Sequence, residues 1–536
     1  MSNSHAGRIA LATAQDRSER PGDDFFRYAL GTRPPRYRLT KRKCSFLRIR
    51  TFCRLLNGCG FGNLQGVNLP SRQAPIFETA PIKQLSPQFS FARSVAAALA
   101  AGVILMTSAF ADVPAGIHAI THATVINPAN GSDELLEMTI LLRGGLITAV
   151  GPTQSTVIPA GAVMHDVAGR FVIPGLWDAH VHLSQVGSKA FPLFVSNGIT
   201  SVRDMGSDFH QIQNWRAERA GGAPIPRILA PGPKLRGGSL IERVGVRFTK
   251  WKHEIRIVTS AADAREAVDE LKVQGVDFIK VHSNLTPELY DAIATESHKV
   301  HLEFSGHLPE AGPLAAAAAG QRTIEHGRGM LLCSPQIWNR IRSSEPAAAQ
   351  YCAPLDIQAM LFPALLRADS WFTPTLTSWR GNAMIGDPTL LTWLNTLPGS
   401  ATVWSDLGNH WADMTGPIPT AFERQLLGQF GSLAAAASRA GVPLLAGTDL
   451  GDPYVIPGFS LHDELALMVN AGVTTLKALQ SATSEPARAF GLGATVGAIN
   501  AGQAADLLVL EADPLLDIDN TRRIYAIVLN GRWFNP

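Results

Sequence analysis

Two histidines separated by one residue, His180 and His182, stand in the run PGLWDAHVH. The apolar residues of this run predict a β-strand, in which positions i and i+2 point to the same face. Two imidazoles that converge on one point suit a divalent transition metal. Such a pair is by itself more often incidental than a ligand pair, but Pro174, Gly175 and Asp178 in the same run favour a metal site.

Four further polar residues stand at the ends of apolar runs. They are Lys280 in DFIKV, His307 in FSGHLP, His326 in TIEHG and Asp449 in LLAGTD. Taken singly, the lysine could be a solvent-exposed side chain, the histidines structural and the aspartate a helix cap. In a barrel of parallel strands, however, the carboxyl ends of the strands form one mouth, so residues far apart in sequence meet there. The joint pattern therefore predicts one metal-binding centre.

These residues need a scaffold of parallel strands, and residues 174–490 have the matching pattern. Short apolar runs alternate with helical segments such as 262–274 and 432–440, which predicts an α/β fold with a TIM (β/α)8 barrel. The stretch 380–424 is long for a connection and is expected to be a helical excursion or a lid. The predicted strands are LWDAHVH, ITSVRDMG, RILAPGP, DFIKVHS, LEFSGHL, RTIEHG, WFTPTLT and PLLAGTDL.

Two β-rich segments flank the predicted barrel. Residues 112–173 contain alternating apolar positions with Gly or Asn at the reversals, and residues 491–536 repeat this pattern in AADLLVLEADP and RIYAIVLNGRWF. We expect the two segments to assemble into one small β-sandwich made from both ends of the mature chain.

The N-terminal part differs from the rest in charge. Lys and Arg are concentrated before residue 60, and residues 1–93 are expected to be a disordered basic extension. Such an arm could bind nucleic acid or a membrane surface, but no aromatic platform or recognition-helix pattern accompanies it, so no nucleic-acid partner is expected.

A signal-like segment follows at residues 94–111, with Arg93 before an apolar run and Ala109-Phe110-Ala111 at its end. It is short for a stable membrane span, which needs about 20 apolar residues. We expect an exported protein, periplasmic or secreted, whose native start lies later than residue 1. The alternative is a helix that anchors a basic cytoplasmic tail.

The composition is that of a globular protein, with 46% hydrophobic and 17% charged residues and a formal net charge of +3. Only Cys333 and Cys352 lie in the part that is expected to fold. They could form a disulfide in an oxidising compartment or remain two thiols.

From about residue 116 to its end, the chain resembles the amidohydrolase superfamily, specifically its imidazolonepropionase-like and prolidase-like branch. The similarity covers some four-fifths of the chain, and the ordered series of motifs is more specific than any one of them. The matching motifs are VIPGLWDAHVH, GITSVRDMG, DFIKVHS, SGHLPE, TIEHG, LLAGTDLG, SLHDELALMVNAGVTTLKALQSAT, GAINAGQAADLLVLEADPLLDI and IVLNGR.

This resemblance implies two metal ions per chain, with zinc as the default and manganese, cobalt or iron as alternatives. It implies His180 and His182 on the more buried ion, and His307 and His326 on the more exposed one. Lys280, carbamylated by carbon dioxide, would bridge the ions.

The resemblance also implies hydrolysis of an amide-type C–N bond, linear or cyclic, in a small-molecule substrate such as an N-acyl amino acid or a dipeptide. Metal coordination lowers the pKa of bound water toward about 7, which makes hydroxide available. Asp449 would ligate the buried ion and act as the catalytic proton carrier between this hydroxide and the leaving nitrogen.

Residues that could select the substrate follow several predicted strands. An arginine at the mouth could hold a substrate carboxylate bidentately, although surface arginines and packed histidines are the ordinary alternatives. Prolidase-like relatives often have a tyrosine after the fourth or fifth strand, where this chain has His-Ser and Phe-Ser, which argues against proline dipeptidase activity. The substrate-binding candidates are Arg203 with Asp204, His282 with Ser283, Arg236, Arg243 and His462.

Other activities remain open. A mononuclear deaminase or imidazolone-type ring-opening hydrolase usually lacks the lysine, and Lys280 is present here. A lactonase, esterase or phosphotriesterase could use the same site. A non-enzymatic scaffold would have lost metal ligands, and none is missing. The chain could also form a homo-oligomer.

Overall fold

The computed structural model describes residues 116–131, 133–246, 253–330, 355–385, 387, 392, 394, 396–397, 411 and 420–535. The basic extension 1–93, the signal-like segment 94–111, Cys333, Cys352 and most of the stretch 380–424 lie outside the described residues, so the predictions for them are not tested. Among the described helices, none is long and apolar enough to cross a membrane.

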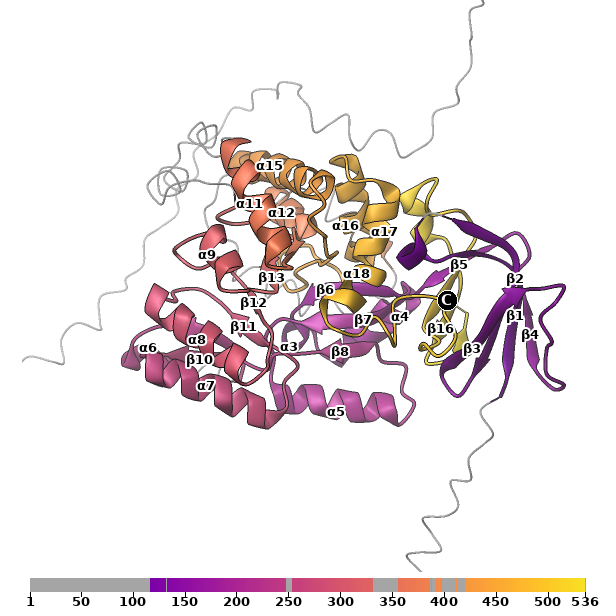
Figure 1. Cartoon of the computed structure of the whole chain (residues 1–536), viewed down its shortest axis with the longest axis horizontal. Coiled ribbons are helices and arrows are strands. Elements are labelled where there is room, and N and C mark those ends of the chain that lie inside the picture. The colour runs from indigo at the N-terminus through magenta and orange to yellow at the C-terminus, as the bar shows by residue number, and fades with distance from the viewer. Residues whose placement is uncertain are drawn as a thin grey trace, which may run out of the picture. The chain divides into compact units, whose positions relative to one another are not determined.

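Both ends of the described chain contribute to one eight-stranded sheet, ordered β17-β16-β15-β5-β1-β2-β3, with β4 paired to β1. The C-terminal β15 runs antiparallel to β5, so that Leu508 lies opposite Ile173. In Figure 1 the indigo and yellow strands accordingly meet. The strands are β1 (His118–Ile126), β2 (Glu134–Arg143), β3 (Leu146–Pro152), β4 (Val163–Asp166), β5 (Phe171–Pro174), β15 (Leu507–Leu510), β16 (Ile524–Leu529) and β17 (Arg532–Phe534).

The parallel strands of the α/β part form within the predicted runs. The eighth run, PLLAGTDL, forms isolated parallel bridges, from Leu444 to Phe372 and from Leu450 to Val181. It therefore links the last strand to the first. The strands are β6 (Leu176–Val181), β7 (Ile199–Asp204), β8 (Arg227–Leu229), β11 (Ile279–Val281), β12 (Phe304–Gly306), β13 (Thr323–Glu325) and β14 (Trp371–Thr373).

The described strands do not form a closed hydrogen-bonded barrel, which corrects the prediction in part. They form a three-stranded sheet, β6-β7-β8, and a six-stranded sheet, β10-β9-β11-β12-β13-β14. The third predicted strand, residues 227–233, forms only β8, and a division separates it from β9 (Lys234–Gly237), which pairs with β10 (Ile255–Val258). Pro231 and Pro233 lie at this division, and proline has no N–H to donate to a sheet.

Helices connect the strands, and their caps are visible in the sequence. Ser260 caps α7 by accepting from the Asp263 N–H, and Thr286 caps α8 ahead of Pro287. The helices are α3 (Leu183–Val186), α4 (Phe191–Ser196), α5 (Phe209–Ala220), α6 (Leu240–Val246), α7 (Ala261–Gln274), α8 (Pro287–Lys299), α9 (Pro313–Ala318), α11 (Leu355–Arg367), α12 (Leu376–Ala383), α15 (Thr420–Arg439), α16 (Phe459–Asn470), α17 (Thr475–Ser481) and α18 (Ser484–Ala489), with 3-10 turns at Pro128–Asn130, Ser188–Ala190 and Ile518–Arg522.

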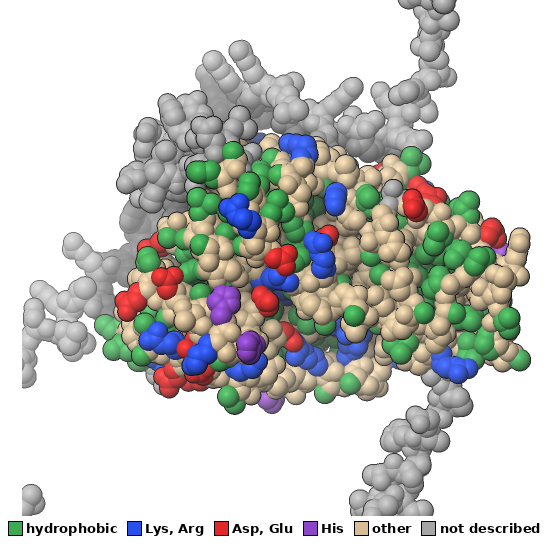
Figure 2. Space-filling model, in the orientation of Figure 1, with side chains coloured by type: hydrophobic (Ala, Val, Ile, Leu, Met, Phe, Trp, Pro, Cys, Tyr) green, Lys and Arg blue, Asp and Glu red, His purple; other side chains and the backbone are tan. Residues whose placement is uncertain are grey.

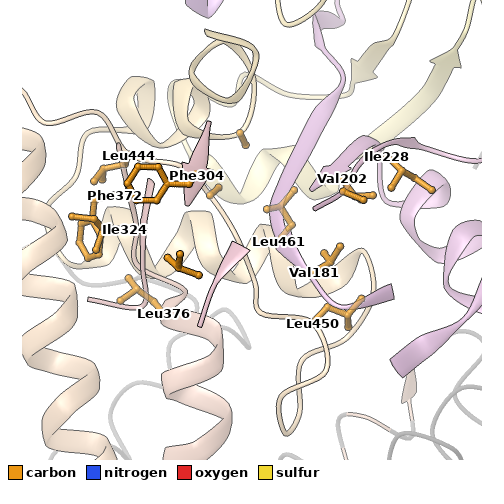
Figure 3. Packing of buried hydrophobic residues seen from close by; sticks show 14 of the residues in the cluster. Val181, Val202, Ile228, Phe304, Ile324, Phe372, Leu376, Leu444, Leu450 and Leu461 are labelled. Carbon is orange, nitrogen blue, oxygen red and sulfur yellow. The ribbon is translucent and has the colours of Figure 1, made fainter. Parts of the chain in front are cut away.

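A continuous apolar core holds these strands in place. Figure 3 shows Val181 and Val202 of β6 and β7, and Phe304, Ile324 and Phe372 of β12 to β14, among its members. Each of these side chains is completely buried. Since burial of apolar surface is the main stabilising contribution to folding, this core fixes the strand ends on which the predicted metal ligands stand.

Candidate metal centre

His180, His182 and Asp449 come together at the ends of β6 and of the 444–450 segment. One ligand atom from each residue lies within 4.8 Å of the other two. Oδ1 of Asp449 is 3.3 Å from Nε2 of His180 and 3.4 Å from Nε2 of His182. The pair predicted from its two-residue spacing therefore shares a carboxylate that lies almost 270 positions along the chain.

Backbone and side-chain hydrogen bonds set this geometry. The Asp449 N–H donates to the His180 carbonyl at 2.8 Å, and Asp449 has a φ of 60°, which turns the chain at this point. The Asp178 carboxylate accepts from the Thr448 N–H at 3.0 Å and from its hydroxyl at 2.7 Å. Asp178 therefore ties β6 to the segment that carries Asp449.

His326 and His307 extend the cluster toward a cavity. Nδ1 of His326 lies 3.3 Å from Oδ2 of Asp449, and the His326 ring is 4.7 Å from the His180 ring, between centroids. The His307 ring is 5.1 Å from that of His326 and 4.2 Å from that of His282. The predicted ligands after β12 and β13 therefore stand beside the His180 group.

Lys280 lies in β11, with only 1% of its surface exposed. Its Nζ has no hydrogen-bond partner among the described residues. Gly306 on the neighbouring strand makes room for it, because a Cβ there would come within 2.0 Å of the Val281 carbonyl and 3.0 Å of the Lys280 side chain. A buried amine without a partner costs free energy, so the site is built for a further group.

The histidines of the centre are held in the neutral form. Burial is the main cause that lowers the pKa of His180, His307 and His326 well below the ordinary value, with nearby cations adding to it. Burial likewise lowers the pKa of His182. A neutral imidazole has a free lone pair, which is the form that binds a metal.

Burial shifts the other two groups toward neutrality as well. It raises the pKa of Asp449 to about 6, and it lowers the pKa of Lys280 to about 8. Nε2 of His180 and Nδ1 of His182 are buried and without a hydrogen-bond partner among the described residues, as is Nζ of Lys280. The unpaired Nε2 of His180 and the Nε2 of His182 lie beside the same Asp449 carboxylate, and this donor set fits a divalent cation.

Glu325 supports the centre and was not identified from the sequence. It is buried, and its Oε2 lies 2.8 Å from Nδ1 of His180. Its other oxygen accepts from the Arg203 guanidinium at 2.7 Å and from the Thr323 hydroxyl. A carboxylate that accepts from Nδ1–H leaves the Nε2 lone pair directed at the centre. Its place directly before His326 is the one sequence signal that could have pointed to it.

Two of the predicted substrate contacts are buried in the structure and bonded to other parts of the chain. Arg203 is completely buried and donates hydrogen bonds to Ala179, Thr323 and Glu325. Its role is therefore structural. His462 is also buried, with its two ring nitrogens 2.9 Å from the Thr521 hydroxyl and 3.1 Å from the Asn197 carbonyl.

Arg243 forms an ion pair with Asp263 at 3.1 Å and keeps a partly exposed side chain. Arg236 lies 3.8 Å from Glu242 and keeps a partly exposed side chain. Asp204 is buried and accepts from the Leu183 and Gly206 backbones, so it is also structural. Of the candidates, His282 and Ser283 line the cavity beside His307.

Comparison with known proteins finds matches to the amidohydrolase family and to several hydrolases. A model of the amidohydrolase family matches residues 417–534, a range that includes Asp449 and the C-terminal strands. An imidazolonepropionase of Salmonella schwarzengrund is 25% identical over 396 residues, covering 71% of this chain and 87% of that protein. A dihydroorotase of Pelobacter propionicus is 41% identical over 93 residues, but the chain covers only 21% of its length.

Solved structures have the same fold. A protein described as a prolidase, from Bifidobacterium longum, is 25% identical with a TM-score of 0.58, covering 78% of this chain and 95% of that one. An ochratoxinase of A. niger is 19% identical with a TM-score of 0.57, covering 79% and 96%. These neighbours imply a TIM barrel with an attached β-sandwich. Together, these matches support an assignment of the chain to the amidohydrolase superfamily.

Proposed function

We propose that the protein is a metal-dependent hydrolase that cleaves an amide-type C–N bond. The observation that carries this proposal is the convergence of His180, His182 and Asp449, with ligand atoms within 4.8 Å of one another, beside the unpaired buried amine of Lys280. The matches to imidazolonepropionase, dihydroorotase and prolidase-like proteins support the same reaction class.

The donor set favours two ions over one. His180, His182 and Asp449 would hold the first, and His307 and His326 the second. Lys280 lies buried on the strand before His307, where a carbamylated amine would bridge them. When bound, the ions would activate water and polarise the substrate carbonyl. A mononuclear deaminase has no use for a buried lysine at this position.

Asp449 is placed to move the proton of the reaction. Its carboxylate reaches three imidazoles, and burial raises its pKa to about 6, close to the operating pH of a general base. Asp449 would accept a proton from the attacking water and donate it to the leaving nitrogen. The nitrogen then departs as a neutral amine, and Asp449 returns to its carboxylate form.

Glu325 and Arg203 hold the imidazole that faces this carboxylate. Glu325 accepts from one ring nitrogen of His180, and Arg203 neutralises the charge of Glu325 within the buried interior. These residues are positioning residues, because they act on the reaction through His180.

The experiment is a substrate screen with the purified chain after loading with Zn²⁺, Mn²⁺ or Co²⁺. N-acyl amino acids, dipeptides, cyclic amides and lactones are offered to the wild type, to His180→Ala and to His210→Ala as a control on the exposed face of α5. We expect amide hydrolysis that His180→Ala abolishes and His210→Ala preserves. Turnover of lactones alone would replace the proposal by an esterase.

We also propose that the chain is exported, on the basis of the signal-like residues 94–111. N-terminal sequencing of the native protein tests this. Asp112 as the first residue supports export, and a retained basic extension contradicts it.

A further inference from the structure

A cavity of about 290 Å³ opens beside the more exposed half of the metal centre. His307 and His326 form one side of it, and His282, Ser283 and Asn284 another. Figure 2 shows the mixture of acidic and basic side chains on one face of the described molecule, so charge alone does not mark the entrance. Selection of a substrate therefore depends on the few charged groups that line the cavity.

Arg328 is the cation among these lining residues, and it is exposed. The other charged residues of the lining are Glu325, which is buried and bonded to Arg203, and the exposed Glu310. No carboxylate of the described residues forms an ion pair with Arg328, in contrast to Arg243 with its bond to Asp263. Among the described residues, the guanidinium therefore has no competing carboxylate and can bind an anion that enters the cavity.

Packing sets the position of this guanidinium. It lies 4.7 Å from the centroid of the Trp379 ring, in a cation–π contact. The indole N–H of Trp379 donates to the His326 carbonyl at 3.2 Å, and its ring stacks on Phe430 at 4.3 Å. Arg328 thus rests on an aromatic surface that is bonded to the backbone of a predicted metal ligand.

Arg328 lines the same cavity as His307 and His326, two of the predicted metal ligands. An anion bound by Arg328 in this cavity would therefore lie beside the predicted metal centre.

We propose that Arg328 binds the carboxylate of the substrate, so that the substrates are amides with a free carboxylate next to the scissile bond, as in N-acyl amino acids. This inference rests on the hydrolase function proposed above and specifies its substrate class. A guanidinium offers two parallel N–H donors that match the two oxygens of a carboxylate. From the sequence, Arg203, Arg236 and Arg243 were the candidates for binding this carboxylate.

The test compares N-acetyl-L-leucine with its uncharged C-terminal amide, N-acetyl-L-leucinamide. Values of kcat/KM are measured for the metal-loaded wild type, Arg328→Gln, Arg328→Lys and, as a control, Arg265→Gln on the exposed face of α7. We expect the preference for the acid over the amide to fall about 10- to 100-fold in Arg328→Gln, the range for loss of a charge-assisted bond. Arg328→Lys should keep part of the preference, because it keeps the charge.

Three outcomes would overturn the proposal. The preference of Arg328→Gln could equal that of the wild type, both substrates could lose the same factor, or Arg265→Gln could show the same change. If the wild type hydrolyses neither compound, the proposed function fails for this class, and calorimetry then measures binding of the intact N-acetyl-L-leucine. Binding that Arg328→Gln weakens about tenfold still supports the anion site, and equal binding rejects it.

Discussion

The two halves of the metal centre differ in what surrounds them. In the inner half, His180 is completely buried and its ring nitrogen is bonded to Glu325, which is itself bonded to Arg203. In the outer half, His307 lies against His282 at the edge of a cavity, and Arg328 has no carboxylate partner among the described residues. The inner half is supported from behind by buried, hydrogen-bonded side chains, whereas the outer half faces a cavity.

We therefore expect the inner half to hold the metal and the outer half to select the substrate. A carboxylate behind a metal-ligating histidine fixes the ring and its tautomer, and a buried ion pair behind that carboxylate keeps it in place. Substitutions in the inner half should therefore change folding, metal binding and rate together. Substitutions in the outer half should change which compound is hydrolysed.

The largest effect is expected for Asp449→Asn, which removes the proton carrier of the inner half. Asparagine tolerates the positive φ of 60° at this position, so the fold should be retained. We expect kcat to fall on the order of 10²- to 10⁴-fold, the range for loss of a general base. Steady-state kinetics and circular dichroism check this together, and near-normal turnover would remove Asp449 from the mechanism.

The next effect concerns the buried pair Arg203–Glu325. Because removal of one partner leaves an uncompensated buried charge, we expect Arg203→Met to lower the free energy of unfolding by about 3–5 kcal/mol. The control is Arg243→Met, which breaks the partly exposed pair with Asp263 and should cost only about 0–1 kcal/mol. Urea unfolding measures both, and equal losses would show that the inner half has no special support.

Lys280 is the proposed bridge between the two halves, and it gives a smaller, conditional effect. With a pKa of about 8, about a tenth of its amine is neutral at pH 7 and able to react with carbon dioxide. Metal occupancy of the wild type should therefore fall several-fold when the protein is prepared without carbon dioxide, and bicarbonate should restore it. Lys280→Ala should be indifferent to bicarbonate. A wild type that is equally indifferent would exclude a carbamylated bridge.

The smallest effect is expected for His462, which the structure removes from the substrate site. His462→Gln should leave kcat/KM within about twofold and cost about 1–3 kcal/mol of stability, through its lost hydrogen bonds. A loss of activity without loss of stability would return His462 to the site.

The same residue predicts a pH dependence of stability. Burial, with the Arg522 charge next, lowers the pKa of His462 from 6.5 to about 3. The unfolded chain then takes up a proton that the folded chain excludes, so this contribution is complete above pH 6.5 and is lost as the pH falls toward 3. Between about pH 7 and 4 the wild type should lose more stability than His462→Gln. Parallel losses would contradict this assignment.

Local patterns in the sequence predicted the strands, and they predicted polar residues that the structure brings together at the strand ends. Each candidate ligand ends or follows a run of apolar residues, and the six-residue β6 is completely buried. Closure of the barrel failed as a prediction because it depends on hydrogen bonds at every strand, and Pro231 and Pro233 interrupt the third run.

Residues whose roles depend on distant partners could not be predicted in this way. Arg203 and Glu325 are 122 positions apart, and the sequence around either residue does not indicate that the two form a pair. A charged residue near a strand end is expected to lie at the mouth of the barrel. The Arg203 side chain is instead buried, and it donates hydrogen bonds to groups of the interior. Arg328 was missed for the opposite reason, since only the cavity distinguishes it from an ordinary surface arginine.

The most direct test is an anomalous-scattering map from a crystal of the metal-loaded chain, recorded at the absorption edge of the metal. The account predicts two peaks, one among His180, His182 and Asp449 and one beside His307 and His326. Loss of the first peak in His180→Ala should accompany loss of amide hydrolysis. Full activity in a crystal form that shows no peak at either position would contradict the metal centre itself.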